Sequence, residues 1–459
     1  MSSRTQALLT APPLPLLLGL TAPNTFAFAI QAAVNLTEVW IVGQLGTEAL
    51  AAMALVFPLL MLTQTMSGGA LGGAISSAIA RALGTANQQR GEQLVWHGIY
   101  GALFGATLFL LLFILFGKSF LMMLGGRGVI LEAALAYCWV LYIGGPILWL
   151  NGAIGAVFRG TGDMAFPAKL MIASSFVQVP LTAGLVLGLF GLPQLGVAGA
   201  AVSSIVIAAG AGSIMLLRLA SPRVVTPLRR QQARLRRDLI KEILLVAQLA
   251  ALNPLMTVGT ILGLTAIVGT FGPEALAGYG IGTRIEYIML PVVFAFGTAL
   301  TTIVGTNIGA GNVARAEQAA WYGVACTALL CGTVGGLLAI FPEAWIPLFT
   351  EDAVAYETAR GYIQIMGPAY AFLGIGLVLY FAAQGAGAMA WPIGAMVLRF
   401  ILAVGGAGIL VTRFDFGVEA VFITAAISLA IYAAINAAAI YFGAWRRLPH
   451  APQKANKTG

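Results

Sequence analysis

The chain has 459 residues, of which 59% are hydrophobic and 9% are charged. A soluble domain carries roughly 25% charged residues, so this chain has too little charge to cover a globule of its size. The composition excludes a soluble domain and a disordered chain. It also excludes a nucleic-acid-binding domain, although the formal net charge is +8. It indicates an integral membrane protein.

Glycine accounts for 57 of the residues, and it is common in membrane helices because it lets neighbouring backbones approach closely. Pairs of glycines four residues apart recur in the apolar runs, for example Gly69 with Gly73 and Gly332 with Gly336. These features predict an all-α polytopic membrane protein. The three cysteines form no C-x-x-C motif and have no histidine beside them, so we expect neither a disulfide framework nor a metal site.

A helix that spans a membrane needs roughly 20 mostly apolar residues. By that criterion the sequence predicts twelve spans, at residues 14–43, 50–80, 93–117, 132–158, 168–190, 196–217, 243–270, 275–308, 318–341, 360–384, 392–412 and 417–444. Pro23, Pro58 and Pro254 lie inside these runs, and each should interrupt the local helix hydrogen bonding.

The distribution of Lys and Arg predicts the orientation. If both termini lie on one side, the segments of that side carry 18 basic residues and those of the other side carry 3. Cytoplasmic loops carry the excess of basic residues, so we expect both termini in the cytoplasm and the chain in the cell inner membrane. Eight of the 18 lie between Arg218 and Lys241. We interpret that segment as a linker held at the anionic inner leaflet, with a lipid-binding or nucleic-acid-binding patch as the alternative.

The sequence contains an internal duplication. Residues 42–51 match residues 268–277 at seven of ten positions, with an offset of 226. With an offset of 225, residues 84–98 match 309–323 at seven of fifteen positions, and 159–167 match 384–392 at five of nine. Three blocks in one order at nearly one offset indicate two copies of one structural unit.

Each copy holds six spans, so both copies have the same orientation and should be related by an axis along the membrane normal. We expect an N-lobe at 1–217, a basic cytoplasmic linker at 218–242, a C-lobe at 243–444 and a cytoplasmic tail at 445–459. In transporters built from such repeats the substrate site lies between the halves, near the middle of the membrane. The duplication thus predicts a transporter that works by alternating access.

Several segments resemble signatures of the multidrug and toxic compound extrusion (MATE) family. They are LTEVWIVGQLG at 36–46 with EALA at 48–51, RALG at 81–84, RGTGD at 159–163, LPQLGVAGAA at 192–201 and NIGAG at 307–311. The resemblance covers essentially the whole chain and is closest to the DinF-like bacterial branch. It implies a cation-coupled antiporter that exports amphipathic, often cationic, toxic compounds from a cavity between the N-lobe and the C-lobe. Members of the family use protons or sodium as the coupling ion.

Many members of the family keep an acidic residue, usually Asp, on the first helix, and Glu38 stands at that position. A carboxylate at bilayer depth costs several kcal/mol, so it should face a cavity or take up a proton. Its repeat counterpart at offset 226 is Leu264, as expected if the acid serves a function rather than the scaffold. The alternative is a structural acid that is hydrogen-bonded to its neighbours. The resemblance makes Glu38 the ion-coupling carboxylate, with H⁺ as the coupling ion.

Sodium remains the alternative coupling ion. Family members with a sodium site in the C-lobe place acids on helices seven and ten, and the predicted spans 243–270 and 360–384 contain none. A sodium site of that type is therefore not expected.

By the same resemblance, polar residues of spans four to six surround the first-helix acid. The matching positions are Asn151, Gln178, Thr182 and Ser203. Gln178 and Thr182 stand where relatives often carry Asn and Asp, so a second N-lobe acid is missing here.

On the first helix, Asn35 and Gln31 precede Glu38 by one and two turns. They form either a relay to the acid or a pair that satisfies itself, and the sequence leaves both readings open. Pro23 matches a first-helix proline of the family, which implies either a bending point or a fixed kink.

A second polar site is predicted in span eight, where Arg284 and Glu286 stand two residues apart. Residues at that spacing do not face each other on a helix, so we expect each to pair with another helix, with Arg399 as a candidate. The pair is either structural or part of the substrate cavity. Tyr142 is a candidate for an aromatic cavity wall that would suit organic cations.

The sequence contains no H-E-x-x-H, G-x-S-x-G or phosphate-loop motif, so we expect no enzyme activity and no cofactor. The expected partners are small amphipathic substrates and the lipid bilayer, and we expect a monomer that binds no nucleic acid. A flippase for lipid-linked precursors is a rival within the transporter class. A channel, a receptor and an intramembrane hydrolase are rivals from other classes.

Overall fold

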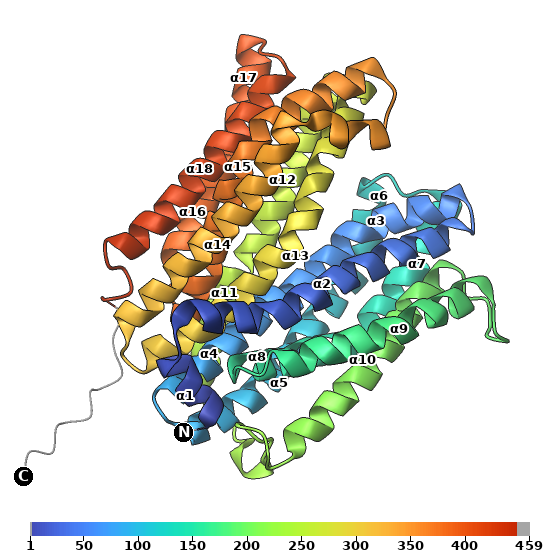
Figure 1. The fold of residues 1–459 in the computed structure, drawn as a ribbon. Coiled ribbons are helices and arrows are strands. Elements are labelled where there is room, and N and C mark those ends of the chain that lie inside the picture. Colours follow the sequence, from blue (N-terminus) through green and yellow to red (C-terminus); the bar gives the residue numbers. More distant parts are fainter. Residues whose placement is uncertain (1, 448–459) are drawn as a thin grey trace, which may run out of the picture. The chain divides into compact units, whose positions relative to one another are not determined.

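The computed structural model describes residues 2–447, and within them every regular element is a helix (Figure 1). Eleven helices are long and apolar enough to cross a membrane, and a bent helix pair raises the number to twelve. The bent pair is α7 (Gly128–Ile143) with α8 (Gly145–Gly160), which meet at an angle of 53°. The twelve predicted spans are therefore confirmed.

The bend in the fourth span has a simple cause. Pro146 lies in the first turn of α8, and proline has no N–H to donate to the carbonyl four residues earlier. Gly144 therefore ends one helix and precedes the next. The sequence prediction treated this span as one unbroken run, so the bend was missed.

The helices of the first half follow in the order of the predicted spans one to six. Their bounds are α1 (Ser3–Thr10), α2 (Pro13–Gly43), α3 (Thr47–Gln64), the π-helical η1 (Thr65–Leu71), α4 (Gly72–Gly84), α5 (Gln88–Leu112), the π-helical η2 (Phe113–Gly117), α6 (Lys118–Met123), α7, α8, α9 (Ala165–Leu187), α10 (Val197–Ala220) and the 3₁₀ turn η3 (Arg230–Gln232).

The second half repeats this order. Its helices are α11 (Arg237–Ala250), α12 (Leu252–Gly269), α13 (Pro273–Gly309), α14 (Val313–Ile340), the 3₁₀ turns η4 (Pro342–Ala344) and η5 (Ile346–Leu348), α15 (Ala353–Ala386), α16 (Ala390–Phe400), the π-helical η6 (Ile401–Gly406), α17 (Ala407–Phe414) and α18 (Val418–Tyr441).

Backbone conformation shows the duplication at positions where the residue types of the two halves differ. Eight of the residues with positive φ angles stand in four pairs at the repeat offset, which are Gly46 with Gly272, Ala86 with Gly311, Gly162 with Gly387 and Phe190 with Asp415. Positive φ is strained for residues other than glycine. The four shared positions therefore show that both halves turn at equivalent places even where the residue type has changed.

Breaks in helix hydrogen bonding also fall at matching places. The π-helical η1 begins at Thr65, and Pro291 stands at the counterpart position inside α13. The π-helical η6 spans 401–406, and its counterpart in α9 contains Pro180. A π turn and a proline each interrupt the regular α-helical hydrogen bonds. The two halves therefore have such an interruption at equivalent positions of these spans.

The chain divides into two compact units. The N-terminal unit consists of residues up to Gln6 and residues 22–247, and the C-terminal unit consists of residues 7–21 and the chain from Gln248 onward. This division differs from the expected lobe boundaries, because residues 7–21 pack with the C-terminal half. The carbonyls of Leu8 and Ala11 accept hydrogen bonds from Asn307 and Arg315, respectively.

The basic linker belongs to the N-terminal unit because it is bonded to α5. Trp96 donates to the carbonyl of Arg229 over 2.9 Å, and Tyr100 donates to the carbonyl of Ala233 over 2.8 Å. The backbone N–H of Arg236 donates to Nε2 of His97 over 2.9 Å. The linker is thus docked along one helix rather than suspended between the two halves.

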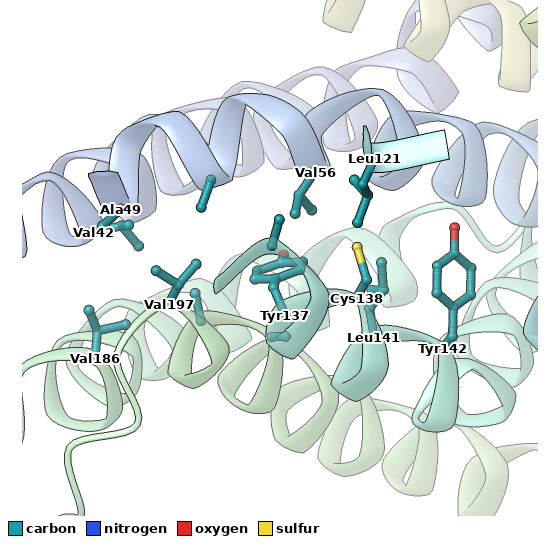
Figure 2. Close-up of a cluster of buried hydrophobic side chains, with 14 of the residues drawn as sticks. Val42, Ala49, Val56, Leu121, Tyr137, Cys138, Leu141, Tyr142, Val186 and Val197 are labelled. Atoms are coloured by element: carbon teal, nitrogen blue, oxygen red, sulfur yellow. The ribbon is translucent and has the colours of Figure 1, made fainter. Parts of the chain in front are cut away.

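A hydrophobic core in the N-terminal unit joins α2 and α3 to α7, α9 and α10. Figure 2 shows the side chains of Val42, Tyr137 and Val197 gathered between these helices. The same cluster includes Ile41, one helical turn after Glu38. This core fixes the face that the second half of α2 presents to its neighbours.

In the C-terminal unit, glycines bring helix backbones into contact. A Cβ atom on Gly335 of α14 would lie 2.1 Å from the carbonyl oxygen of Gly367 on α15, and one on Gly278 of α13 would lie 2.4 Å from the carbonyl oxygen of Ala355. Only glycine fits at such approaches. The glycine content noted in the sequence therefore reflects real backbone contacts in this unit.

Candidate functional site

Glu38 lies on the face of α2 that packs into the N-terminal unit. Val34, Ile41 and Val42 are buried, and they stand at the i−4, i+3 and i+4 positions relative to Glu38, which places all four on one side of the helix. Packing of these apolar residues against the N-terminal unit therefore also turns Glu38 toward that unit. The Glu38 side chain itself is only partly buried.

Two side chains of α9 donate to the same oxygen of Glu38. The Gln178 Nε2 lies 2.8 Å from Oε1, and the Thr182 hydroxyl lies 3.3 Å from it. Gln178 and Thr182 are one turn apart and both are buried. The Thr182 hydroxyl also lies 2.5 Å from the Ser203 hydroxyl of α10. The structure thus brings together Glu38, Gln178 and Thr182, as the family resemblance implied, with Ser203 behind them.

The partners of Glu38 are neutral. Within residues 2–447 no Lys or Arg forms an ion pair with its carboxylate, and no hydrogen bond reaches Oε2. Tyr137 of α7 is buried and lies close enough to interact with the acid electrostatically. Sequence reasoning missed Tyr137, because nothing in the sequence relates its helix to the acid. Neutral donors orient a carboxylate without cancelling its charge, and Oε2 is left available to a proton.

The other polar residues of the predicted site lie elsewhere. Gln31 donates to Oδ1 of Asn35 over 3.1 Å, so these two side chains satisfy each other. No hydrogen bond joins Asn35 to Glu38 in the described part of the chain. Asn151 lies on α8, where its buried Oδ1 has no hydrogen-bond partner and faces Gly212 of α10.

Pro23 lies inside the continuous helix α2, and the division between the two compact units falls beside it, between Thr21 and Ala22. The next residue, Asn24, is buried and donates to the sulfur of Met164 over 3.2 Å. The helix is therefore anchored to the N-terminal unit directly after the proline.

Tyr142 does not line an open cavity in the N-terminal unit. It is 4% exposed, its ring stacks on Phe113 with a centroid distance of 4.6 Å, and its hydroxyl lies 3.4 Å from that of Thr63. The expectation of a cavity wall is not met at this position, because the residue packs into the core that Figure 2 shows.

In the C-terminal unit, Arg284 and Glu286 point to different partners, as their spacing predicts. Glu286 accepts a hydrogen bond of 3.0 Å from Tyr362 and interacts electrostatically with Arg399. The guanidinium of Arg284 lies over the ring of Phe349, 4.9 Å from its centroid. Glu286 and Arg399 thus interact electrostatically, but they form no ion pair within the described part of the chain.

Aromatic residues that sequence reasoning did not single out surround Glu286. The hydroxyls of Tyr370 and Tyr362 lie 3.4 Å apart, and the rings of Tyr279 and Tyr362 meet edge to face at 5.5 Å. Arg399 lies 5.8 Å from the ring centroid of Tyr432. Only spatial proximity reveals this cluster, since its members come from four helices spread over about 150 residues of sequence.

Neither site has the composition of a metal centre. Within residues 2–447 no group of three or more His, Cys, Asp or Glu side chains is placed to hold a metal ion. What the two sites can do chemically is different. The Glu38 site can bind and release a proton or a small cation. The Glu286 cluster instead combines a carboxylate, the guanidinium of Arg399 and several tyrosine hydroxyls.

A model of the MatE family matches the chain in two segments, residues 23–183 and 250–407. The probable multidrug resistance protein NorM of Thermotoga maritima is 29% identical over 60% of this chain and 58% of its own length. The FAD transporter of Shewanella oneidensis is 26% identical over 81% of this chain and 82% of its own. The chain thus spans less than two thirds of the first relative and most of the second.

Solved structures of transporters have the same fold. A multidrug resistance MATE family transporter of the MOP superfamily, in an outward-facing conformation, superposes with a TM-score of 0.88 at 23% identity over 97% of this chain and 99% of its own. A MOP superfamily transporter from Pyrococcus furiosus, described as having a binding pocket of reverse polarity, gives a TM-score of 0.89 at 22% identity over the same shares. The two family-model segments correspond to the two halves of the duplication.

Proposed function

This chain belongs to the MatE family of membrane transporters, and from that premise we propose that it is a proton-coupled multidrug efflux antiporter in which Glu38 carries the proton. The observation that carries the proposal is the isolation of Glu38 among neutral donors, with Oε1 held by Gln178 and Thr182. A carboxyl group that alternates between charged and neutral forms can couple a proton to a change in helix packing.

In the proposed cycle, a proton from the outside binds Oε2 of Glu38 while Oε1 keeps its two donors. The neutral carboxyl costs less to bury than the carboxylate, so α2 moves further into the N-terminal unit, with Pro23 as the bending point. The substrate loses its binding surface and leaves to the outside. Release of the proton to the cytoplasm restores the charged, substrate-accepting state. The site is open to one side of the membrane at a time.

One proton per cycle supplies roughly 1.4 kcal/mol per unit of pH difference and roughly 2.3 kcal/mol per 100 mV of membrane potential. For a neutral substrate both terms contribute, which supports a concentration ratio of a few hundred. Exchange for a monovalent cation moves no net charge, so only about tenfold per pH unit remains. The charge of the substrate therefore sets how steep a gradient one acid can maintain.

A sodium-coupled antiporter of the same family and a flippase for lipid-linked precursors are the alternatives. Sodium prefers several oxygen ligands, whereas Oε1 of Glu38 is already held by two donors. Large lipid-linked substrates call for a strongly basic cavity, which the sequence does not indicate. The proton-coupled reading fits the neutral surroundings of Glu38 better than either alternative does.

A second candidate substrate is a flavin dinucleotide. The Shewanella FAD transporter matches in sequence over 81% of this chain, which is a longer sequence match than the 60% that the NorM relative from Thermotoga gives. Uptake of FAD into inside-out proteoliposomes, compared with uptake of an organic cation, distinguishes the two substrate classes. FAD uptake without cation uptake would replace the multidrug reading.

The proposed location is the cell inner membrane with both termini in the cytoplasm, since 18 basic residues fall on that side and 3 on the other. We further propose that the chain works as a monomer, because each of the two compact units has a buried hydrophobic cluster of its own. Substituted-cysteine labelling at Arg230 and Arg413 from either side of the membrane checks the orientation.

Competition between proton and substrate is a direct consequence of the proposal. Addition of ethidium, an amphipathic cation, to purified protein in weak buffer should release protons, because binding favours the charged form of Glu38. The release should disappear in Glu38→Gln and persist in Glu48→Gln, a matched change at an exposed acid of α3. Undiminished proton release by the Glu38 variant would overturn the assignment.

A further inference from the structure

Arg284 lies on an exposed face of a spanning helix. Its neighbours one turn along α13, Tyr287 and Ile288, are exposed as well, whereas Ile285 and Met289 are buried. The three exposed residues stand at the i, i+3 and i+4 positions, so they share one side of the helix. That side presents a cation, a phenol and an apolar group together.

The charge of Arg284 is not compensated. In the described part of the chain it makes no hydrogen bond and no ion pair, and its one recorded contact is with the ring of Phe349. Glu286, two residues along, does not neutralise it, because Glu286 accepts a hydrogen bond from Tyr362 and interacts electrostatically with Arg399. An arginine within a membrane span is costly in hydrocarbon, and such residues face water-filled paths or partners. Arg284 has no such partner among the described residues, so the cost of burying its charge in hydrocarbon favours an aqueous environment for it.

Other contacts within the C-terminal unit hold Phe349 in place beside Arg284. The Trp345 indole donates to the carbonyl of Ile281 over 3.1 Å, and its ring lies 5.0 Å from that of Phe349. These contacts fold the segment between α14 and α15 back onto α13. Phe349 is thus held beside the guanidinium, and its 40% exposed ring leaves room for a ligand to contact it.

We propose that Arg284 is a substrate-recognition residue for the anionic group of planar aromatic compounds. A guanidinium offers a planar fork that matches carboxylate or phosphate, and Phe349 and Tyr287 supply ring surface beside it. The repeat counterpart of Arg284, at offset 226, is Pro58, so only the second half carries this cation, as only the first half carries Glu38. The proposal rests on the proposed transport function and extends the substrates of the multidrug proposal from organic cations to anionic aromatic compounds.

The test compares two dyes that share a xanthene ring system but differ in charge. A cationic rhodamine ester and anionic fluorescein are offered to proteoliposomes under one imposed proton gradient. The variants are Arg284→Gln, Arg284→Lys and a control, Arg413→Gln, which changes an exposed arginine at the end of α17. We expect Arg284→Gln to lower fluorescein transport by roughly tenfold and to leave rhodamine transport within about twofold. Arg284→Lys should restore part of the fluorescein rate, and Arg413→Gln should change neither.

The outcomes separate this proposal from the transport proposal. Rhodamine transport without any fluorescein transport by the wild type overturns the anionic substrate class and leaves the efflux function standing. Equal fluorescein transport by the wild type and Arg284→Gln also overturns the proposal, and it is the result expected if Arg284 serves a lipid phosphate. If Arg284→Gln loses both dyes, the anisotropy of each dye bound to purified protein decides. Selectively weaker fluorescein binding supports the proposal, and unchanged fluorescein binding overturns it.

Discussion

Gln178 donates a hydrogen bond of 2.8 Å to Oε1 of Glu38, although 140 residues separate the two in sequence. The bond joins α9 to α2 within the N-terminal unit, and Thr182 reinforces it from one turn further along α9. A neutral donor at this position holds the carboxylate in one orientation, and in the proposed mechanism the other oxygen takes up the proton.

Removal of the Gln178 amide should impair coupling without unfolding the protein. A hydrogen bond to a charged group contributes roughly 1.5–3 kcal/mol, so Gln178→Leu should lower the proton-driven transport rate by about tenfold or more. The measurement is dye efflux from proteoliposomes. Gln231→Leu, an exposed position in the linker, is the control and should keep the wild-type rate. A wild-type rate in Gln178→Leu would show that Thr182 alone orients the acid.

Asp163 should stabilise the N-terminal unit through two arginines. Its side chain is 5% exposed and lies 2.8 Å from Arg4 and 3.2 Å from Arg218. Breaking a buried pair costs roughly 3–5 kcal/mol, but both arginines are about half exposed, so we expect Asp163→Asn to cost about 1–2 kcal/mol. Thermal unfolding in detergent measures the loss, with Asp415→Asn in an exposed turn as the control. Equal melting temperatures of the two variants would show that the ion pairs contribute nothing.

The close contact of α14 with α15 gives a sharp test of helix packing. A Cβ at Gly335 would lie 2.1 Å from the carbonyl oxygen of Gly367, whereas one at Gly336 would have nothing within 4 Å. Gly335→Ala should force the helices apart and cost roughly 2–3 kcal/mol. Gly336→Ala, one residue later, should be neutral or slightly stabilising because alanine favours helix. Similar melting temperatures for the two variants would contradict the backbone contact.

Replacing Ala86, which has a strained left-handed backbone conformation, with glycine should raise the stability of the protein. Ala86 has a φ angle of 57°, and its repeat counterpart Gly311 has one of 79°. A left-handed conformation costs a residue with a Cβ roughly 1–2 kcal/mol, so Ala86→Gly should stabilise the protein by about 1 kcal/mol despite the added chain entropy. Gly311→Ala should destabilise it by a similar amount. Both effects are read from melting temperatures in detergent, and effects of the same sign would contradict the shared turn geometry.

The twelve spans were predictable from the sequence because the bilayer demands about 20 apolar residues for each helix. The duplication was predictable because three blocks recur at one offset. The bend at Gly144 was not predicted, although Pro146 signals it, because the apolar run continues through both residues. The π-helical turns have no sequence signature of their own and were found only at proline positions of the other half.

The candidate site was predictable in part. The resemblance to a family placed Gln178 and Thr182 beside Glu38, and the structure brings them within hydrogen-bond distance. Asn151 and Asn35 make no hydrogen bond to the acid in the part of the chain that the structure describes. Tyr142 was expected at a cavity but is packed in the core. Polar residue type alone cannot show which side of a helix faces the acid, so these residues were beyond sequence reasoning.

Transport by purified protein in liposomes tests the central claim most directly. Wild type and Glu38→Gln are compared with a fluorescent organic cation, under a proton gradient and separately under a sodium gradient. The account predicts transport driven by the proton gradient alone, and its loss in Glu38→Gln. Sodium-driven transport that survives Glu38→Gln would contradict it and move the coupling site to Glu286 and its neighbours.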